Sequence, residues 1–127
     1  MKRMVLALAL SFGMAAPALA DAVEGVWKTQ VDDGAYAHVT ISQCGSALCG
    51  VISRTFKESG EYKSENIGKK LVWDMQPNGG GRYSGGKIWQ PSTGKVFKSK
   101  MTLSGSSLKV EGCVAVFCKK QTWSRVK

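Results

Sequence analysis

The strongest constraint on the fold of this chain is a series of short segments in which apolar and polar residues alternate. Ala37, Val39 and Ile41, for example, alternate with polar residues, and so do Met101 and Leu103. Successive side chains of a strand point to opposite faces, so this period of two predicts half-buried strands. About eight such segments occur, with turn residues roughly every 8–12 positions. The pattern predicts an all-β antiparallel meander without crossover helices.

The expected strands share this alternation or a short run of β-branched residues, and they cover residues 23–31, 37–41, 48–52, 71–75, 83–89, 97–103, 108–110 and 119–126. In the fourth strand we expect Leu71, Trp73 and Met75 to share one face. Residues 54–70 are charged and lack a clear period, which predicts a long loop with a short helical turn. The strands fit either a sandwich or a barrel. We favour the barrel, because closure removes exposed strand edges.

The N-terminus has the pattern of a signal peptide. Lys2 and Arg3 precede an apolar run over residues 4–16, and Ala18-Leu19-Ala20 gives a small-x-small cleavage site before Asp21. We expect residues 1–20 to be removed and residues 21–127 to form one domain in the periplasm or outside the cell. No later segment approaches the roughly 20 apolar residues of a membrane-spanning helix. The sequence therefore predicts a soluble exported protein, which we expect to be a monomer.

Four cysteines occur as two equally spaced pairs, Cys44 with Cys49 and Cys113 with Cys118. Four cysteines allow three disulfide pairings. In a hairpin with a four-residue loop the members of each pair would lie opposite each other, which favours Cys44–Cys49 and Cys113–Cys118. Bridges between the two hairpins remain the alternative. Zinc binding is disfavoured, because the spacing is longer than usual and export favours oxidation. We expect no metal and no cofactor.

The chain is basic, with a formal net charge of +9, and only Lys2 and Arg3 of its basic residues lie in the expected signal peptide. A basic surface attracts polyanions. For an exported protein these are lipid head groups, lipopolysaccharide phosphates, cell-wall polymers or an acidic protein, and nucleic acid is not expected. Scattered lysines are equally typical of a solvated surface.

Several motifs resemble the bacterial domain of unknown function 2147 family. They are Gly25-Val26-Trp27-Lys28-Thr29, Cys44-Gly45-x3-Cys49-Gly50, Pro91-x2-Gly94-Lys95, Leu108-Lys109-Val110-x-Gly112-Cys113 and Gln121-Thr122-Trp123-Ser124-Arg125. The resemblance implies a small exported protein without an established activity. Members often have Asp before the Pro of the third of these motifs and Tyr after its Gly-Lys, where this chain has Gln90 and Phe97.

A second resemblance is to lipocalins and related calycin barrels, which begin with Gly-x-Trp on the first strand. Gly25 and Trp27 match that motif, and Arg125 matches an arginine near the last strand. The resemblance implies that Trp27 closes the base of the barrel and that Arg125 lies across it. Gly25, Trp27 and Arg125 are therefore expected to be structural.

Trp73, Tyr83 and Trp89 lie on strands that flank the glycine-rich residues 79–81. On inner faces these aromatic side chains would either fill the core or line a small apolar pocket. They are the candidate ligand-binding residues. His38 is the one histidine of the sequence, and its position in the alternation places it on a polar face. No motif marks a nucleophile, so the sequence does not favour an enzyme.

Two functions fit these observations best, and a hydrolase or isomerase centred on His38 is the third and least favoured class. The first is a calycin-like binding module for a small apolar or amphipathic molecule of the cell envelope. The alternative is a basic interaction protein that binds anionic envelope polymers, lipid head groups or an acidic partner protein. The biochemical activity and the identity of the ligand do not follow from the sequence.

Overall fold

A computed structural model describes residues 20–127, and the expected signal peptide, apart from Ala20, lies outside these described residues. The strands are β1 (Gly25–Lys28), β2 (Ala35–Cys44), β3 (Ala47–Lys57), β4 (Gly60–Tyr62), β5 (Lys70–Gly79), β6 (Arg82–Gln90), β7 (Lys95–Ser104), β8 (Ser107–Val114) and β9 (Phe117–Arg125). Within the described part of the chain no helix is long and apolar enough to cross a membrane.

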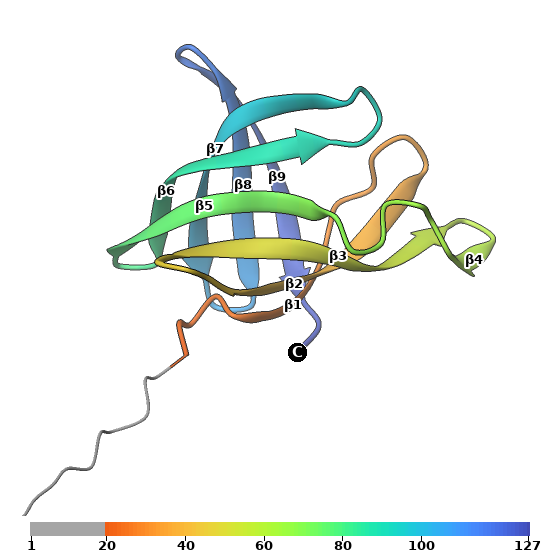
Figure 1. The fold of residues 1–127 in the computed structure, drawn as a ribbon, viewed down its shortest axis with the longest axis horizontal. Helices are drawn as coiled ribbons and strands as arrows, with labels where there is room; N and C mark the ends of the chain where they lie inside the picture. Colours follow the sequence, from red (N-terminus) through yellow and green to blue (C-terminus); the bar gives the residue numbers. More distant parts are fainter. Residues whose placement is uncertain (1–19) are drawn as a thin grey trace, which may run out of the picture.

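The strands form one antiparallel sheet in the order β2-β1-β9-β8-β7-β6-β5-β3-β4 (Figure 1). An additional pairing of β2 with β3 closes the sheet, so that eight strands make a barrel and only β4 lies outside it. The expected all-β barrel is therefore confirmed. Closure gives every barrel strand two neighbours and leaves no long edge open to another chain.

The interior contains the side chains that the alternation had assigned to it. Ala37, Val39 and Ile41 are buried on β2, as are Met101 on β7 and Val110 on β8. The first expected strand is shorter than predicted, because β1 ends at Lys28 and Val31 is 62% exposed.

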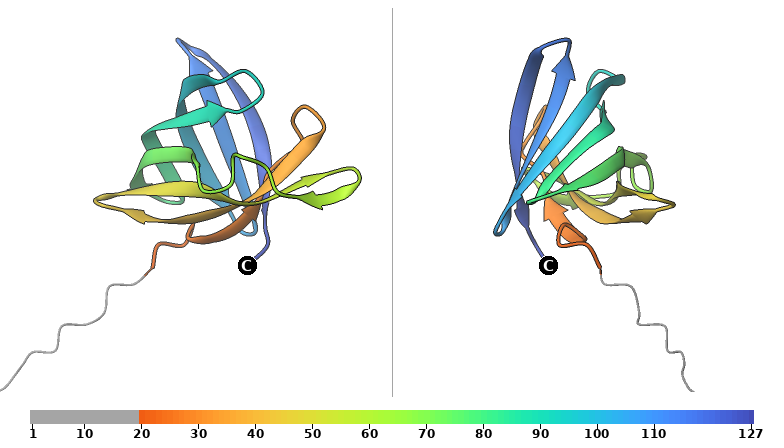
Figure 2. Two further views of the ribbon diagram at one scale, coloured as in Figure 1. Left: turned by 45° about the vertical axis from the view of Figure 1, so that its right-hand side comes forward. Right: turned by 90° about the vertical axis from the view of Figure 1, so that its left-hand side faces the viewer.

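Residues 54–70 form the loop expected from the sequence only in part, because only residues 63–69 form a long segment outside the strands. Strand β3 continues to Lys57, and a tight turn connects it to β4 in a projecting hairpin (Figure 2). In this hairpin Phe56 pairs with Glu61. The hydroxyl of Thr55 donates a hydrogen bond to the carbonyl oxygen of Tyr62, and Arg54 forms a bidentate ion pair with Glu61. Two of the charges that obscured the strand pattern, Arg54 and Glu61, are thus cross-strand partners on the outside of a projecting hairpin.

Strand β5 contains an irregularity that the expected alternation missed. Leu71, Val72 and Met75 are buried, whereas Trp73 is only half-buried. The register with β3 shifts beside Val72, and Asp74 has a φ of 57°. A bulge adds a residue to one strand and reverses the faces beyond it. The prediction that Leu71, Trp73 and Met75 share one face is therefore wrong.

The four cysteines form two local disulfides, as favoured from the sequence. Cys44 is bonded to Cys49 and Cys113 to Cys118. Both turns contain two residues instead of the four expected. In the first hairpin Cys44 pairs with Ala47, so this disulfide runs diagonally, whereas Cys113 and Cys118 are directly opposite each other.

Candidate ligand-binding site at the open end of the barrel

One end of the barrel, which we call the closed end, is sealed around Trp27. The indole nitrogen of Trp27 donates a hydrogen bond of 2.9 Å to the carbonyl oxygen of Val23. The guanidinium of Arg125 lies over the indole, 4.4 Å from the ring centroid, and donates hydrogen bonds to the carbonyl oxygens of Ala22 and Glu24. These contacts satisfy the polar groups where the chain enters and leaves the barrel, near the bottom of Figure 1.

Gly25 is required at this crowded point. Its φ is 138°, and a Cβ there would lie 2.8 Å from a guanidinium nitrogen of Arg125 and 2.5 Å from the carbonyl oxygen of Lys127. Any side chain would displace the arginine from the indole. The three residues expected to be structural therefore meet at one place, at the base of the barrel.

Tyr83 also belongs to the closed end. Its ring is buried in the core, and its hydroxyl donates a hydrogen bond to the carboxylate of Asp21. Burial raises the pKa of the phenol above its ordinary value, and the hydrogen bond to Asp21 raises the pKa further. Tyr83 thus fixes the first described residues to the barrel as a neutral donor.

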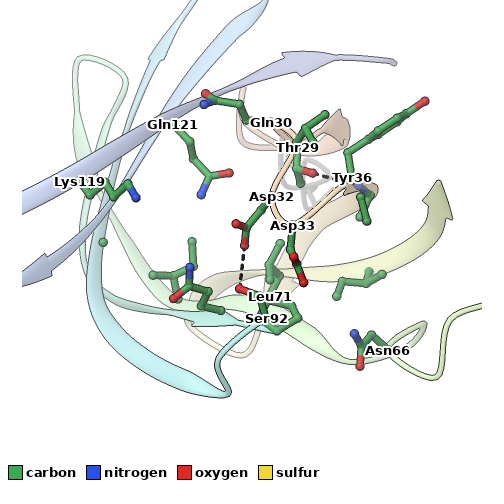
Figure 3. Close-up of a pocket in the computed structure, with 18 of the residues that line it drawn as sticks. Thr29, Gln30, Asp32, Asp33, Tyr36, Asn66, Leu71, Ser92, Lys119 and Gln121 are labelled. Atoms are coloured by element: carbon green, nitrogen blue, oxygen red, sulfur yellow. Dashed lines mark hydrogen bonds between the residues drawn. The ribbon is translucent and has the colours of Figure 1, made fainter. Parts of the chain in front are cut away.

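The opposite end, which we call the open end, contains a hollow of about 1020 Å³ (Figure 3). Its apolar wall is formed by one inward residue from each of five strands, namely Ala37, Ile52, Leu71, Ile88 and Phe97. Gly112 also lines the hollow and leaves it wider than any other residue would. A Cβ at this position would occupy part of the space, 3.3 Å from Cγ2 of Ile88. Ligand pockets typically have roughly 300–1,000 Å³, so the hollow has room for a small molecule.

The rim of the hollow is polar and carries both signs of charge. Asp32, in the turn between β1 and β2, accepts a hydrogen bond of 3.1 Å from the hydroxyl of Ser92 in the β6–β7 turn. Figure 3 shows this contact together with Lys119, and Lys57 also lines the hollow. An apolar interior below a charged rim suits an amphipathic molecule better than a purely polar one.

Ser99 lies on the inner face of β7, one inward position deeper than Phe97 and opposite Gly112. Its hydroxyl is buried and has no hydrogen-bond partner among the described residues. A buried hydroxyl without a partner is energetically costly. Ser99 itself does not line the hollow.

The three aromatic residues proposed from the sequence are not brought together. Tyr83 is in the closed end, whereas Trp73 and Trp89 neighbour the inward residues Val72 and Ile88 and are half-buried. The ammonium of Lys69 lies 5.5 Å from the ring centroid of Trp89. None of the three lines the hollow.

His38 lies on the outer surface of β2, next to Phe56, with ring centroids 4.7 Å apart. Partial burial lowers the pKa of its imidazole, and the nearby positive charge of Arg54 lowers the pKa further. His38 is therefore predominantly neutral near pH 7. In residues 20–127 no three His, Cys, Asp or Glu side chains gather in a way that could hold a metal ion.

Most residues that line the hollow were not proposed from the sequence as ligand-binding, although Gly112, Gln90 and Phe97 lie in or beside the family motifs. Ile88 and Phe97 were assigned to strands, and alternation within these strands gives their inward direction. The hollow arises because inward residues from separate strands fail to fill one end together. No local motif records that property.

Comparison with known proteins identifies the family. Residues 25–125 match the family described as "Uncharacterized protein conserved in bacteria (DUF2147)". The chain belongs to this family. The comparison with curated proteins gives no match.

Among solved structures, the fold is similar to that of protein HP1028 from the human pathogen Helicobacter pylori, which is described as belonging to the lipocalin family. The TM-score is 0.65 with 15% sequence identity, and the alignment covers 83% of each chain. At this identity the likeness concerns the fold: this DUF2147 protein is a lipocalin-like barrel.

Proposed function

We propose that this protein is a binding module that holds a small apolar or amphipathic molecule in the open end of its barrel. The observation that carries the proposal is the hollow of about 1020 Å³ with an apolar wall and a charged rim. Lipocalin-like barrels are large enough to hold one small ligand in the interior.

The compartment is part of the same proposal. The signal-peptide pattern of residues 1–20 and the two local disulfides support a protein that works in the periplasm or outside the cell. The ligand would then be a component of the cell envelope. Native mass spectrometry of protein purified from that compartment tests this directly, because an apolar ligand adds a defined mass.

The cavity itself is tested with a fluorescent apolar probe such as phenylnaphthylamine, displaced by long-chain fatty acid. Leu71→Trp places a larger ring in the hollow, since Leu71 is one of its wall residues. We expect this variant to bind the probe at least about tenfold more weakly. The added ring occupies space in the hollow, so the probe loses apolar contact area with the wall.

The matched control is Val96→Trp, an enlargement of similar size at a residue that is 50% exposed on β7. It should bind the probe like the unaltered protein. Equal binding by all three proteins would show that the probe does not occupy the hollow, and the proposal would then fail.

A further inference from the structure

The tip of the β8–β9 hairpin is the most exposed apolar feature among residues 20–127. Val114, Val116 and Phe117 are 62%, 85% and 79% exposed, and Ala115 completes the tip. This hairpin projects beyond the barrel at the top of Figure 1, away from the C-terminus. Exposed apolar side chains that form a contiguous group often mark an interaction site, whereas singly scattered ones do not.

The tip is held in a fixed shape. Cys113 and Cys118 pair directly across the hairpin, with 4.0 Å between their Cα atoms, immediately below Val114 and Phe117. The turn residue Ala115 has a φ of 53°. A cross-linked tip keeps its apolar side chains displayed, so little conformational entropy is lost when they bind.

Basic residues surround the base of the tip. Lys119 and Lys120 follow Cys118, and Lys98 pairs with Cys113 on the neighbouring strand. All three are exposed. The acidic residue among them is Glu111, which pairs with Lys120 across the hairpin and lies 4.0 Å from the ammonium of Lys109. The base of the tip is therefore net positive.

We propose that this hairpin docks the protein on an anionic lipid bilayer, with the apolar tip in the acyl boundary and the lysines at the phosphates. A stable protein partner usually covers about 800 Å² on each side. Four residues on a narrow projection offer much less than that. An apolar tip above a basic collar instead matches the layered chemistry of a membrane interface.

Docking in this way would also orient the barrel. Val114 and Phe117 line the hollow as well as the tip, so the open end would face the lipid. The rim of the hollow would then lie at the lipid head groups, with the apolar wall behind it. The inference does not depend on the proposed ligand, because the tip can bind lipid whether or not the hollow is filled.

The test is flotation of the purified protein with phosphatidylcholine vesicles, with and without phosphatidylglycerol. We expect binding to the phosphatidylglycerol vesicles only, and weaker binding as salt screens the lysines. Phe117→Ser should reduce the partition coefficient about tenfold or more. Val126→Ser, at an exposed valine near the chain terminus, should leave binding unchanged.

The charge contribution is tested with Lys120→Gln, which we expect to reduce partitioning about fivefold, since each lysine near an anionic surface contributes about that factor. Lys127→Gln, with the same charge change near the closed end, is the matched control. A Val116→Trp variant should show blue-shifted added emission on anionic vesicles, as expected for a ring that enters the acyl boundary.

Two results would overturn the inference. One is equal binding by Phe117→Ser and the unaltered protein. The other is binding to a soluble polyanion such as heparin without binding to the vesicles, which would assign the lysines to an anionic polymer. Leu71→Trp separates the two proposals, because it should lose the apolar probe while still binding vesicles.

Discussion

The two ends of the barrel are built from the same strands but are filled differently. At the closed end Trp27, Tyr83 and Met75 occupy the interior, and Arg125 covers it. At the open end the strands contribute Ala37 and Gly112, whose small size leaves a hollow. A small barrel of this kind can therefore place its stability in one half and its binding capacity in the other.

The polar groups follow the same division. At the closed end the indole of Trp27, the guanidinium of Arg125 and the hydroxyl of Tyr83 all have hydrogen-bond partners. Toward the open end the buried hydroxyl of Ser99 has none among the described residues. Buried polar groups are normally paired, so this hydroxyl is an exception.

The largest expected effect comes from removing one aromatic ring at each end. Trp27→Ala should lower the free energy of unfolding by about 3–5 kcal/mol, because a buried ring is lost and a cavity remains. Phe97→Ala should cost about 1–2 kcal/mol, because its half-buried ring already faces a hollow. Urea unfolding followed by circular dichroism measures both. Equal losses would show that the open end is packed as tightly as the closed end.

Two inward glycines give a subtler version of the same comparison. A Cβ at Gly50 would lie 2.7 Å from Cγ1 of Val39 and 3.0 Å from Cγ2 of Val72, whereas at Gly112 the nearest atom is 3.3 Å away. Gly50→Ala should therefore destabilise the protein by about 1–3 kcal/mol through overpacking. Gly112→Ala should stay within about 1 kcal/mol of the unaltered protein, because the hollow lets Ile88 move. Thermal unfolding of the two variants side by side decides, and the reverse order would contradict the comparison.

Much of the barrel follows from the sequence, since alternation identifies inward residues such as Val39, Ile41 and Met101 without reference to other strands. The bulge in β5 does not, because it depends on how Val72 pairs with Gly50 of another strand. The projecting β3–β4 hairpin was missed for a related reason: Arg54 and Glu61 are recognisable as partners only once the strands are paired.

The candidate site was harder to predict than the fold. Large aromatic side chains often line pockets, which favoured Trp73 and Trp89 as ligand-binding residues. A hollow, however, forms where small side chains face the interior. Ala37 and Gly112 face the cavity. Ala37 lies in no motif, and the family motif that includes Gly112 does not indicate a pocket. Whether an alanine faces a void depends on the combined volume of side chains from several strands, which the sequence of one strand does not contain.

The smallest expected effect tests the closed end by pH. Because the pKa of Tyr83 is raised in the folded protein, the unfolded chain loses this proton first as pH increases. The stabilisation is therefore complete below the ordinary phenol pKa of about 10 and decreases above it, by at most about 1.4 kcal/mol per pH unit. The difference in unfolding free energy between the unaltered protein and Tyr83→Phe should be constant up to that pH and change in favour of the variant beyond it.

Asp21→Asn separates the two causes of the raised pKa. Burial is the larger cause and is unchanged in this variant, so part of the alkaline loss of stability should remain. Measuring the difference also cancels the titration of the lysines, which all variants share. If Tyr83→Phe loses as much unfolding free energy at high pH as the unaltered protein, Tyr83 is not buried as a neutral donor. Water would then reach the closed end despite its close packing.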